Sequence, residues 1–128
     1  MPTNDNAPPE PCIGVIDDDE AVLHSVRVLL ELHNLNVLVF ASAEAAMQSP
    51  SLGRCRCLIV DMEMPGASGL QFVEALRAKA DQTPVILTTS NPHFSEPHRI
   101  RKSNILALLV KPVPQNELLA WIRHSLNA

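Results

Sequence analysis

The residues CLIVD at positions 57–61 form a short apolar run that ends in an aspartate. Such a run, rich in β-branched residues and leucine, is typical of a parallel strand that helices cover on both faces. The segment from Gly69 to Lys79 follows it with apolar residues at helical spacing. The residues expected to face inward are Phe72, Val73, Leu76 and Ala80. This stretch therefore predicts one buried strand followed by one amphipathic helix.

The same alternation recurs along the chain. Four apolar segments are clear and a weaker one lies between the first two; the predicted strands are Cys12–Asp17, Asn36–Phe40, Cys57–Asp61, Pro84–Thr89 and Leu106–Val110. The predicted helices are Glu20–Leu32, a short one from Ser42 that Pro50 ends, Gly69–Lys79, Ser95–Ser103 and Gln115–Leu126. Pro97 fits only the first turn of its helix, and Asn34 and Asn104 suit the turns that follow helices. The pattern predicts an α/β protein of five βα units.

Length and composition restrict the class of protein. A chain of 128 residues has room for one folded domain, which we place at 12–128, after a polar, proline-rich lead-in at 1–11 that we expect to be disordered. The lead-in lacks the basic and apolar regions of a signal peptide, and no apolar run could cross a bilayer. We therefore expect a cytoplasmic location and no membrane role. A net charge of −4 offers no basic face and argues against direct nucleic acid binding.

The three cysteines are Cys12, Cys55 and Cys57. An odd number without CxxC spacing argues against a disulfide framework, so we expect reduced thiols. No second Cys/His pair stands at the spacing of a zinc site. Packing residues at the start of a strand are the better interpretation of Cys55 and Cys57.

Polar side chains follow four of the five predicted strands. Asp17 ends the first strand and Asp18 follows it, Asp61 ends the third, Thr89 ends the fourth and Lys111 follows the fifth. In a parallel sheet with right-handed crossovers these ends meet at one edge, where ligands bind. Each residue alone has an ordinary explanation: a helix start, a hydroxyl that caps backbone, or a surface lysine. Their joint occurrence indicates a functional site.

The chemistry of this set is consistent with metal-assisted phosphoryl transfer. Two like charges about 4 Å apart repel by about 4 kcal/mol at an effective dielectric near 20, so clustered carboxylates favour a bound cation. Mg²⁺ prefers such hard oxygen ligands and keeps several waters. An aspartate can accept a phosphoryl group as an acyl phosphate, while Lys111 and Thr89 could neutralise and hydrogen-bond its oxygens.

Four ordered motifs make the prediction specific: VIDDD (15–19), VDMEMPGASG (60–69), PVILTTS (84–90) and Lys111-Pro112. Together they resemble the signature set of response-regulator receiver domains, and the resemblance extends from Ile13 to about Leu126. It implies a flavodoxin-like (βα)₅ three-layer sandwich. Its five-stranded parallel sheet, with strands numbered along the chain, would have the order 2-1-3-4-5.

The resemblance also implies a role for each site residue. Asp61 would accept the phosphoryl group, and Thr89 and Lys111 would contact it. The Mg²⁺ ligands would be Asp17, Asp18, Asp61 and the backbone carbonyl of Glu63. The Lys111-Pro112 peptide bond would be cis. Such a chain is a signalling switch that catalyses only its own phosphorylation and dephosphorylation.

The implied partners lie on both sides of the switch. A sensor histidine kinase or a histidine phosphotransfer protein would supply the phosphoryl group, and a downstream effector protein or output domain would read the surface of the last two helices and the last strand. The resemblance leaves open a phosphorylation-dependent homodimer. Leu108 stands where the family usually has Tyr or Phe, and Pro97 interrupts the usual helix. The residues at the positions that tune phosphoryl lifetime are Glu63 and Asn91.

Three alternatives remain open at this point. A phosphatase of the haloacid-dehalogenase kind would need a D-x-D motif, which Asp17 and Asp19 satisfy only within an acidic run, and a cap domain for which there is no room. A nucleotide-binding protein would need a glycine-rich phosphate loop, which is missing from the sequence. A phosphorylation-independent adaptor on the same fold is the main competitor, because the output residues are atypical.

Overall fold

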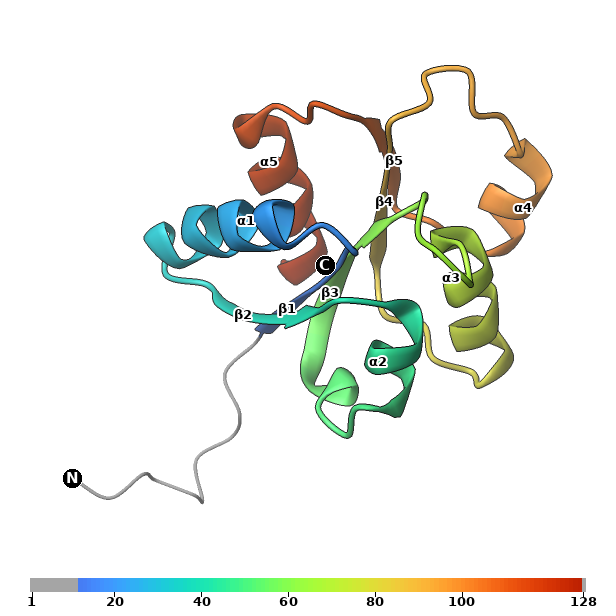
Figure 1. Cartoon of the computed structure of the whole chain (residues 1–128), viewed down its shortest axis with the longest axis horizontal. Helices are drawn as coiled ribbons and strands as arrows, with labels where there is room; N and C mark the ends of the chain where they lie inside the picture. The colour runs from blue at the N-terminus through green and yellow to red at the C-terminus, as the bar shows by residue number, and fades with distance from the viewer. Residues whose placement is uncertain (1–11, 128) are drawn as a thin grey trace.

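The computed structural model describes residues 12–127, so the predicted lead-in lies outside the described residues. Strands and helices alternate along this part of the chain (Figure 1). The strands are β1 (Cys12–Ile16), β2 (Asn36–Phe40), β3 (Cys55–Asp61), β4 (Val85–Thr89) and β5 (Ala107–Val110). The helices are α1 (Glu20–Leu32), α2 (Ala43–Gln48), α3 (Gly69–Ala78), α4 (Pro97–Lys102) and α5 (Gln115–Leu126), with a 3₁₀ turn at Leu52–Arg54.

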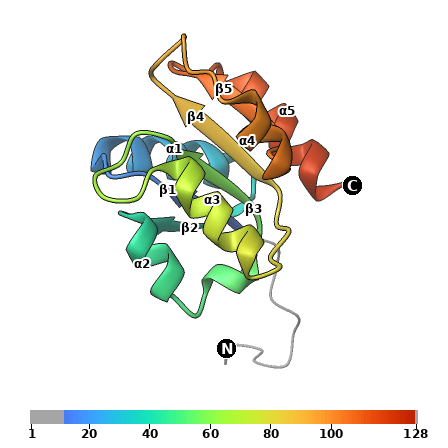
Figure 2. The same ribbon diagram turned by 90° about the vertical axis from the view of Figure 1, so that its right-hand side faces the viewer.

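The strands form one parallel sheet in the order β2-β1-β3-β4-β5. Helices α1 and α5 cover one face, and α2, α3 and α4 cover the other (Figure 2). The predicted fold class and strand order are thus confirmed. The strand β3 lies at the centre of the sheet, where Asp61 pairs with Thr88 of β4.

The core consists of two apolar clusters, one on each face of the sheet. In β3, Leu58 and Val60 belong to the cluster beneath α2 and α3, while Cys57 and Ile59 belong to the one beneath α1 and α5. Because successive side chains of a strand point to opposite faces, both sets must be apolar. Full burial of one such side chain contributes about 1.5 to 3 kcal/mol. This explains the continuous apolar run at the centre of the sequence.

Side-chain caps start α1 and α3 next to the carboxyl edge of the sheet. The Asp19 carboxylate accepts hydrogen bonds from the amides of Ala21 and Val22 at the start of α1. Ser68 and Gln71 form a capping box at the start of α3. A Cβ atom on Gly69 would lie 2.4 Å from the Asp61 carbonyl oxygen, so glycine is required for this close approach. The start of α3 therefore packs directly against the end of β3.

The structure corrects several predicted boundaries. The strand β3 begins at Cys55, two residues before the predicted start, and α4 covers only Pro97–Lys102, with the proline in its first turn as expected. Ala80, predicted to face inward, is exposed and has φ of 64°, because it follows the end of α3 in the left-handed turn conformation. The turns at Asn34 and Asn104 are confirmed, with φ of 63° and 55°.

The three cysteines are free and buried, as expected. Burial, and after it the neighbouring Cys12, raises the pKa of the Cys55 thiol to about 12. Such a thiol is protonated and inert at neutral pH. Among residues 12–127, no helix combines the length and the hydropathy needed to cross a bilayer.

Candidate functional site

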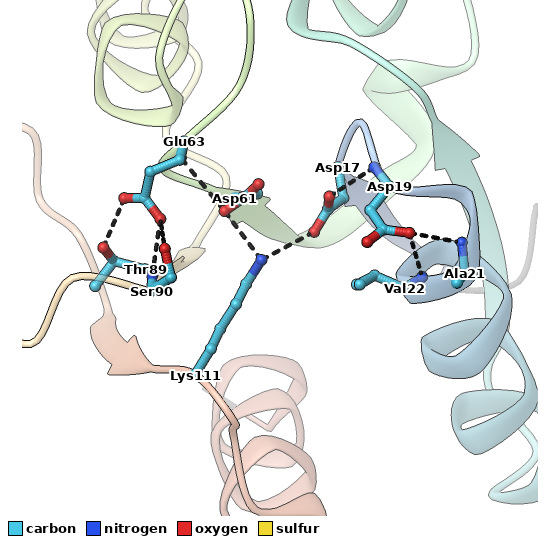
Figure 3. A network of polar contacts seen from close by, with 9 residues as sticks. All are labelled: Asp17, Asp19, Ala21, Val22, Asp61, Glu63, Thr89, Ser90 and Lys111. Carbon is cyan, nitrogen blue, oxygen red and sulfur yellow. Dashed lines mark hydrogen bonds and ion pairs between the residues drawn. The ribbon is translucent and has the colours of Figure 1, made fainter.

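The carboxyl ends of four strands bring the predicted site residues to one edge of the sheet (Figure 3). Asp17 directly follows β1 and Asp61 ends β3; both are buried, with 3% and 4% of their surface exposed. Asp18 lies next to them and is exposed. Thr89, fully buried, ends β4, and Lys111 follows β5. The predicted convergence of these side chains is therefore observed.

Asp17, Asp18 and Asp61 form a compact acidic cluster. One carboxylate oxygen of each lies within 4.8 Å of the others. The Asp17 Oδ1 atom accepts a hydrogen bond from the Asp19 amide at 2.9 Å, which fixes the turn after β1. The Asp61 Oδ1 atom accepts one from the Glu63 amide at 3.3 Å. The backbone thus holds two buried carboxylates close together despite their repulsion.

Lys111 lies between the two buried carboxylates. Its Nζ atom is 3.3 Å from Asp17 Oδ2 and 3.1 Å from Asp61 Oδ1. The Lys111-Pro112 peptide bond is cis, as expected, and the Lys111 amide donates to the Thr89 carbonyl at 2.8 Å. Burial lowers the pKa of Lys111, but the hydrogen bond to Asp61 and the charge of Asp17 outweigh it, so the pKa is raised overall. The ammonium group stays charged at neutral pH.

Asp61 lies in an environment that disfavours its charged form. Burial raises its pKa; Lys111 lowers it, the charge of Asp17 raises it again, and the net direction is upward. One ammonium group therefore does not compensate three clustered carboxylates. The donor set contains only hard oxygen atoms and has an excess of negative charge, which fits a small divalent cation such as Mg²⁺.

The Glu63 carboxylate makes contacts that the sequence did not predict. Its Oε2 atom accepts from the Thr89 hydroxyl at 2.6 Å, and its Oε1 atom accepts from the Ser90 amide at 2.7 Å and the Ser90 hydroxyl at 2.9 Å. Burial raises the pKa of Glu63, but the hydrogen bonds from Thr89 and Ser90 lower it overall. The resemblance had assigned Glu63 a backbone carbonyl for the metal and a position that tunes phosphoryl lifetime, but no contact for its carboxylate. A carboxylate two residues after Asp61 and a Thr-Ser pair at the end of the next strand were the available signal.

A cavity of about 590 Å³ extends from the site between α1 and α5. Asp17, Asp61 and Lys111 lie at its polar end, and the remaining wall is largely apolar, with Val26 of α1 and Leu118 of α5. The Asp61 carboxylate therefore lines this cavity beside Lys111, although very little of its own surface is exposed.

The fold and this edge of the sheet are those of a signalling receiver, and comparison with known proteins agrees. The family model of the response regulator receiver domain matches residues 13–123, so the chain belongs to this family.

Two curated relatives are longer proteins. The chain is 32% identical to the response regulator protein TodT of Pseudomonas putida over 115 residues, which cover 90% of the chain and 51% of TodT. It is also 32% identical to the transcriptional regulatory protein FixJ of Azorhizobium caulinodans, over 90% of the chain and 54% of FixJ. The chain thus spans about half the length of these curated relatives.

Solved structures show the same architecture. The response regulator StyR superimposes with a TM-score of 0.80 at 31% identity, over 91% of this chain and 59% of StyR. A response regulator receiver protein from Pseudomonas putida has a TM-score of 0.83 at 21% identity, over 92% of this chain and 99% of that one. The second likeness concerns the fold alone.

Proposed function

We propose that this receiver domain is a Mg²⁺-dependent phosphorylation switch with Asp61 as the phosphoryl acceptor. The observation that carries the proposal is the position of Asp61: it ends the central strand, contacts Lys111 and lies in a cluster with Asp17 and Asp18. The phosphoryl donor would be a sensor histidine kinase or a histidine phosphotransfer protein. A downstream effector protein or output domain would respond to the change.

The metal would be held by Asp17, Asp18 and Asp61, together with the backbone carbonyl of Glu63. The hard, negatively charged donor set described above supports this assignment. Bound Mg²⁺ would neutralise negative charge on the transferring phosphoryl group. Asp17 and Asp61 both contact Lys111, so their orientation does not depend on the cation alone.

The residues of the chain perform the remaining steps. An Asp61 carboxylate oxygen attacks phosphorus, the new P–O bond forms as the bond to the donor nitrogen breaks, and the imidazole of the donor leaves with the electron pair. Lys111 compensates charge on the phosphoryl oxygens, and the Thr89 hydroxyl donates a hydrogen bond to one of them. The Thr89 hydroxyl moves toward Asp61 and alters the surface formed by α4, β5 and α5.

The proposal also includes the location and the interactions of the receiver domain. The chain acts in the cytoplasm, modifies only itself, and contacts neither nucleic acid nor membrane directly. Phosphorylation could also promote a homodimer. A second candidate is an adaptor that works without phosphorylation, which Leu108 favours, because leucine offers no ring to reorient at the position of the usual aromatic.

Phosphorylation by acetyl phosphate separates the two candidates. Intact mass spectrometry should show one added phosphoryl group on the wild type with Mg²⁺ and none with EDTA. Asp61→Asn should stay unlabelled with Mg²⁺, because an amide oxygen is a poor nucleophile. A wild type that is not labelled supports the adaptor, and labelling of Asp61→Asn at the wild-type level shows that another residue is the acceptor.

A further inference from the structure

The Glu63 side chain occupies the hydrogen-bond donors at the end of β4 (Figure 3). It accepts three hydrogen bonds, from one donor of Thr89 and two donors of Ser90, at 2.6 to 2.9 Å. The carboxylate itself is charged and the bonds are short, so each is of the stronger, charge-assisted kind. These contacts hold the first residues of the segment between β4 and α4.

The Thr89 hydroxyl can donate a hydrogen bond to only one anion at a time. A threonine hydroxyl has a single proton to donate, and in this structure the proton points to Glu63. A phosphoryl group on Asp61 would need the same proton, and it would also repel the Glu63 carboxylate with a charge of roughly −1.5 to −2. Binding of the phosphoryl group by Thr89 therefore requires that the bond to Glu63 break.

We propose that the Glu63 carboxylate is an autoinhibitory clamp, which competes with the phosphoryl group for the Thr89 hydroxyl and keeps the receiver in its inactive conformation. This inference rests on the proposed function and adds a residue that opposes it. The clamp sets a threshold: phosphorylation must first displace Glu63 from Thr89 and Ser90. A receiver whose residue at this position cannot accept a hydrogen bond from Thr89 would lack that threshold.

The clamp is connected to the segment that leads into α4. The Thr89 Oγ1 atom accepts from the Asn91 amide at 3.0 Å, and the Asn91 carbonyl accepts from the Phe94 amide at 3.1 Å. The Phe94 side chain packs against the same apolar cluster as Ile100 and Leu108. Movement of the Thr89 hydroxyl away from Glu63 thus pulls on Asn91 and, through the turn, on Phe94.

Calorimetric titration with beryllofluoride, a phosphoryl mimic, tests the clamp at saturating Mg²⁺. Glu63→Gln should bind beryllofluoride about tenfold more tightly than the wild type, equivalent to about 1.4 kcal/mol, because its bond to Thr89 is no longer charge-assisted and the repulsion is gone. The matched control is Glu44→Gln, which removes a carboxylate located beside Gly66 in the neighbouring loop. It should change the affinity less than twofold.

Two further variants test whether Glu63 acts through the Thr89 hydroxyl. In a Thr89→Ala background, Glu63→Gln should give less than a threefold gain, because the competition for the hydroxyl proton no longer exists. Ser90→Ala, which leaves the Thr89 bond in place but removes one donor to Glu63, should tighten binding by about twofold to threefold. This second variant keeps the test decisive if Glu63→Gln does not fold.

The possible outcomes are distinct. Affinities of Glu63→Gln and Ser90→Ala that match the wild type, or a gain that Glu44→Gln reproduces, overturn the clamp while the proposed function stands. If Glu63→Gln raises the beryllofluoride affinity equally with and without the Thr89 hydroxyl, the clamp is overturned as well, because Glu63 then does not act through that hydroxyl. If the wild type itself fails to bind beryllofluoride with Mg²⁺, the proposed function and the clamp fall together.

Discussion

At the scale of single residues, the buried carboxylate of Asp61 is costly in the metal-free fold. Its raised pKa means that the folded state binds the Asp61 proton more tightly than the unfolded chain does. The contribution of such a group to stability is present below the unfolded pKa and is lost as the pH rises through the folded pKa. At neutral pH without metal, ionised Asp61 therefore opposes folding.

Asp61→Asn should relieve this cost. In EDTA at pH 7, the variant should have a free energy of unfolding higher by roughly 0.5 to 2 kcal/mol, the common range for a stabilising substitution. The gain should shrink as the pH falls and vanish below about pH 4, where aspartate is protonated in both states. Urea unfolding at several pH values measures it, with exposed Glu31→Gln as the control. A variant less stable than the wild type at pH 7 would show that the contact with Lys111 outweighs burial.

Sequence patterns located the site residues because each one ends or follows a strand. Asp17, Asp61, Thr89 and Lys111 could be placed together from the topology of a parallel sheet alone. The Glu63 carboxylate could not, because its direction depends on how the loop after β3 turns. That loop contains Pro65 and Gly66, and Gly66 has φ of 78°. Such a turn directs side chains in ways that neither periodicity nor motif spacing specifies.

At the scale of elements, the predicted bounds of α1, β2 and α5 agree with the structure, and those of β3 and α4 were the least accurate. The central strands β1, β3 and β4 were recognised from their apolar runs, because these strands are buried on both faces. The early start of β3 was missed because Arg56, exposed near the amino end of this strand, interrupts the apolar run. Helix α4 is six residues long and has no side-chain cap at its start, so contacts with the rest of the fold determine its limits.

Arg77 provides much of that support from α3. Its guanidinium donates to the carbonyl oxygens of Ser103 at 2.7 Å, Asp81 at 2.8 Å and Thr83 at 2.9 Å. Arg77→Met should lower the free energy of unfolding by roughly 2 kcal/mol or more, because it leaves partly buried carbonyls without donors. Arg101→Met, on the exposed surface of α4, should cost less than about 0.5 kcal/mol. Equal urea midpoints for the two variants would contradict this role of Arg77.

Coupling between the site and α4 is a second property of elements. Leu108 is half-buried and packs against the same apolar cluster as Phe94 and Ile100. In the proposed switch, movement of the Thr89 loop would reach α4 and β5 through this cluster. A shift of the ratio of active to inactive conformation from 1:99 to 99:1 needs about 5.5 kcal/mol of differential interaction. Leucine fills less volume than the usual aromatic side chain. We therefore expect weaker coupling between the site and α4, with the active and inactive conformations both populated.

Amide NMR spectra of the protein with Mg²⁺ and beryllofluoride test this coupling. Chemical-shift changes should extend through residues 95–115 in the wild type, with line broadening from exchange between the two states. They should shrink in Thr89→Ala, which removes the hydroxyl that starts the movement. Changes confined to the neighbours of Asp61 in both proteins would favour the adaptor.

At the scale of the whole molecule, the repulsion at one edge of the sheet links metal binding to global stability. The acidic cluster exists only in the folded chain, since β1 and β3 bring Asp17, Asp18 and Asp61 together from distant parts of the sequence. A cation that binds the cluster therefore stabilises the fold by mass action. At a Mg²⁺ concentration 100 times its dissociation constant, this linkage is worth about 2.7 kcal/mol.

The melting temperature of the wild type should therefore rise by several degrees with saturating MgCl₂, measured against NaCl at the same ionic strength to separate binding from screening. Asp18→Ala should lose most of this rise, because the exposed Asp18 carboxylate of the wild type would bind the ion directly. Its melting temperature without metal should equal or exceed that of the wild type, since one repulsive charge is gone. A Mg²⁺-dependent rise in Asp18→Ala as large as in the wild type would exclude Asp18 as a ligand and place the ion elsewhere.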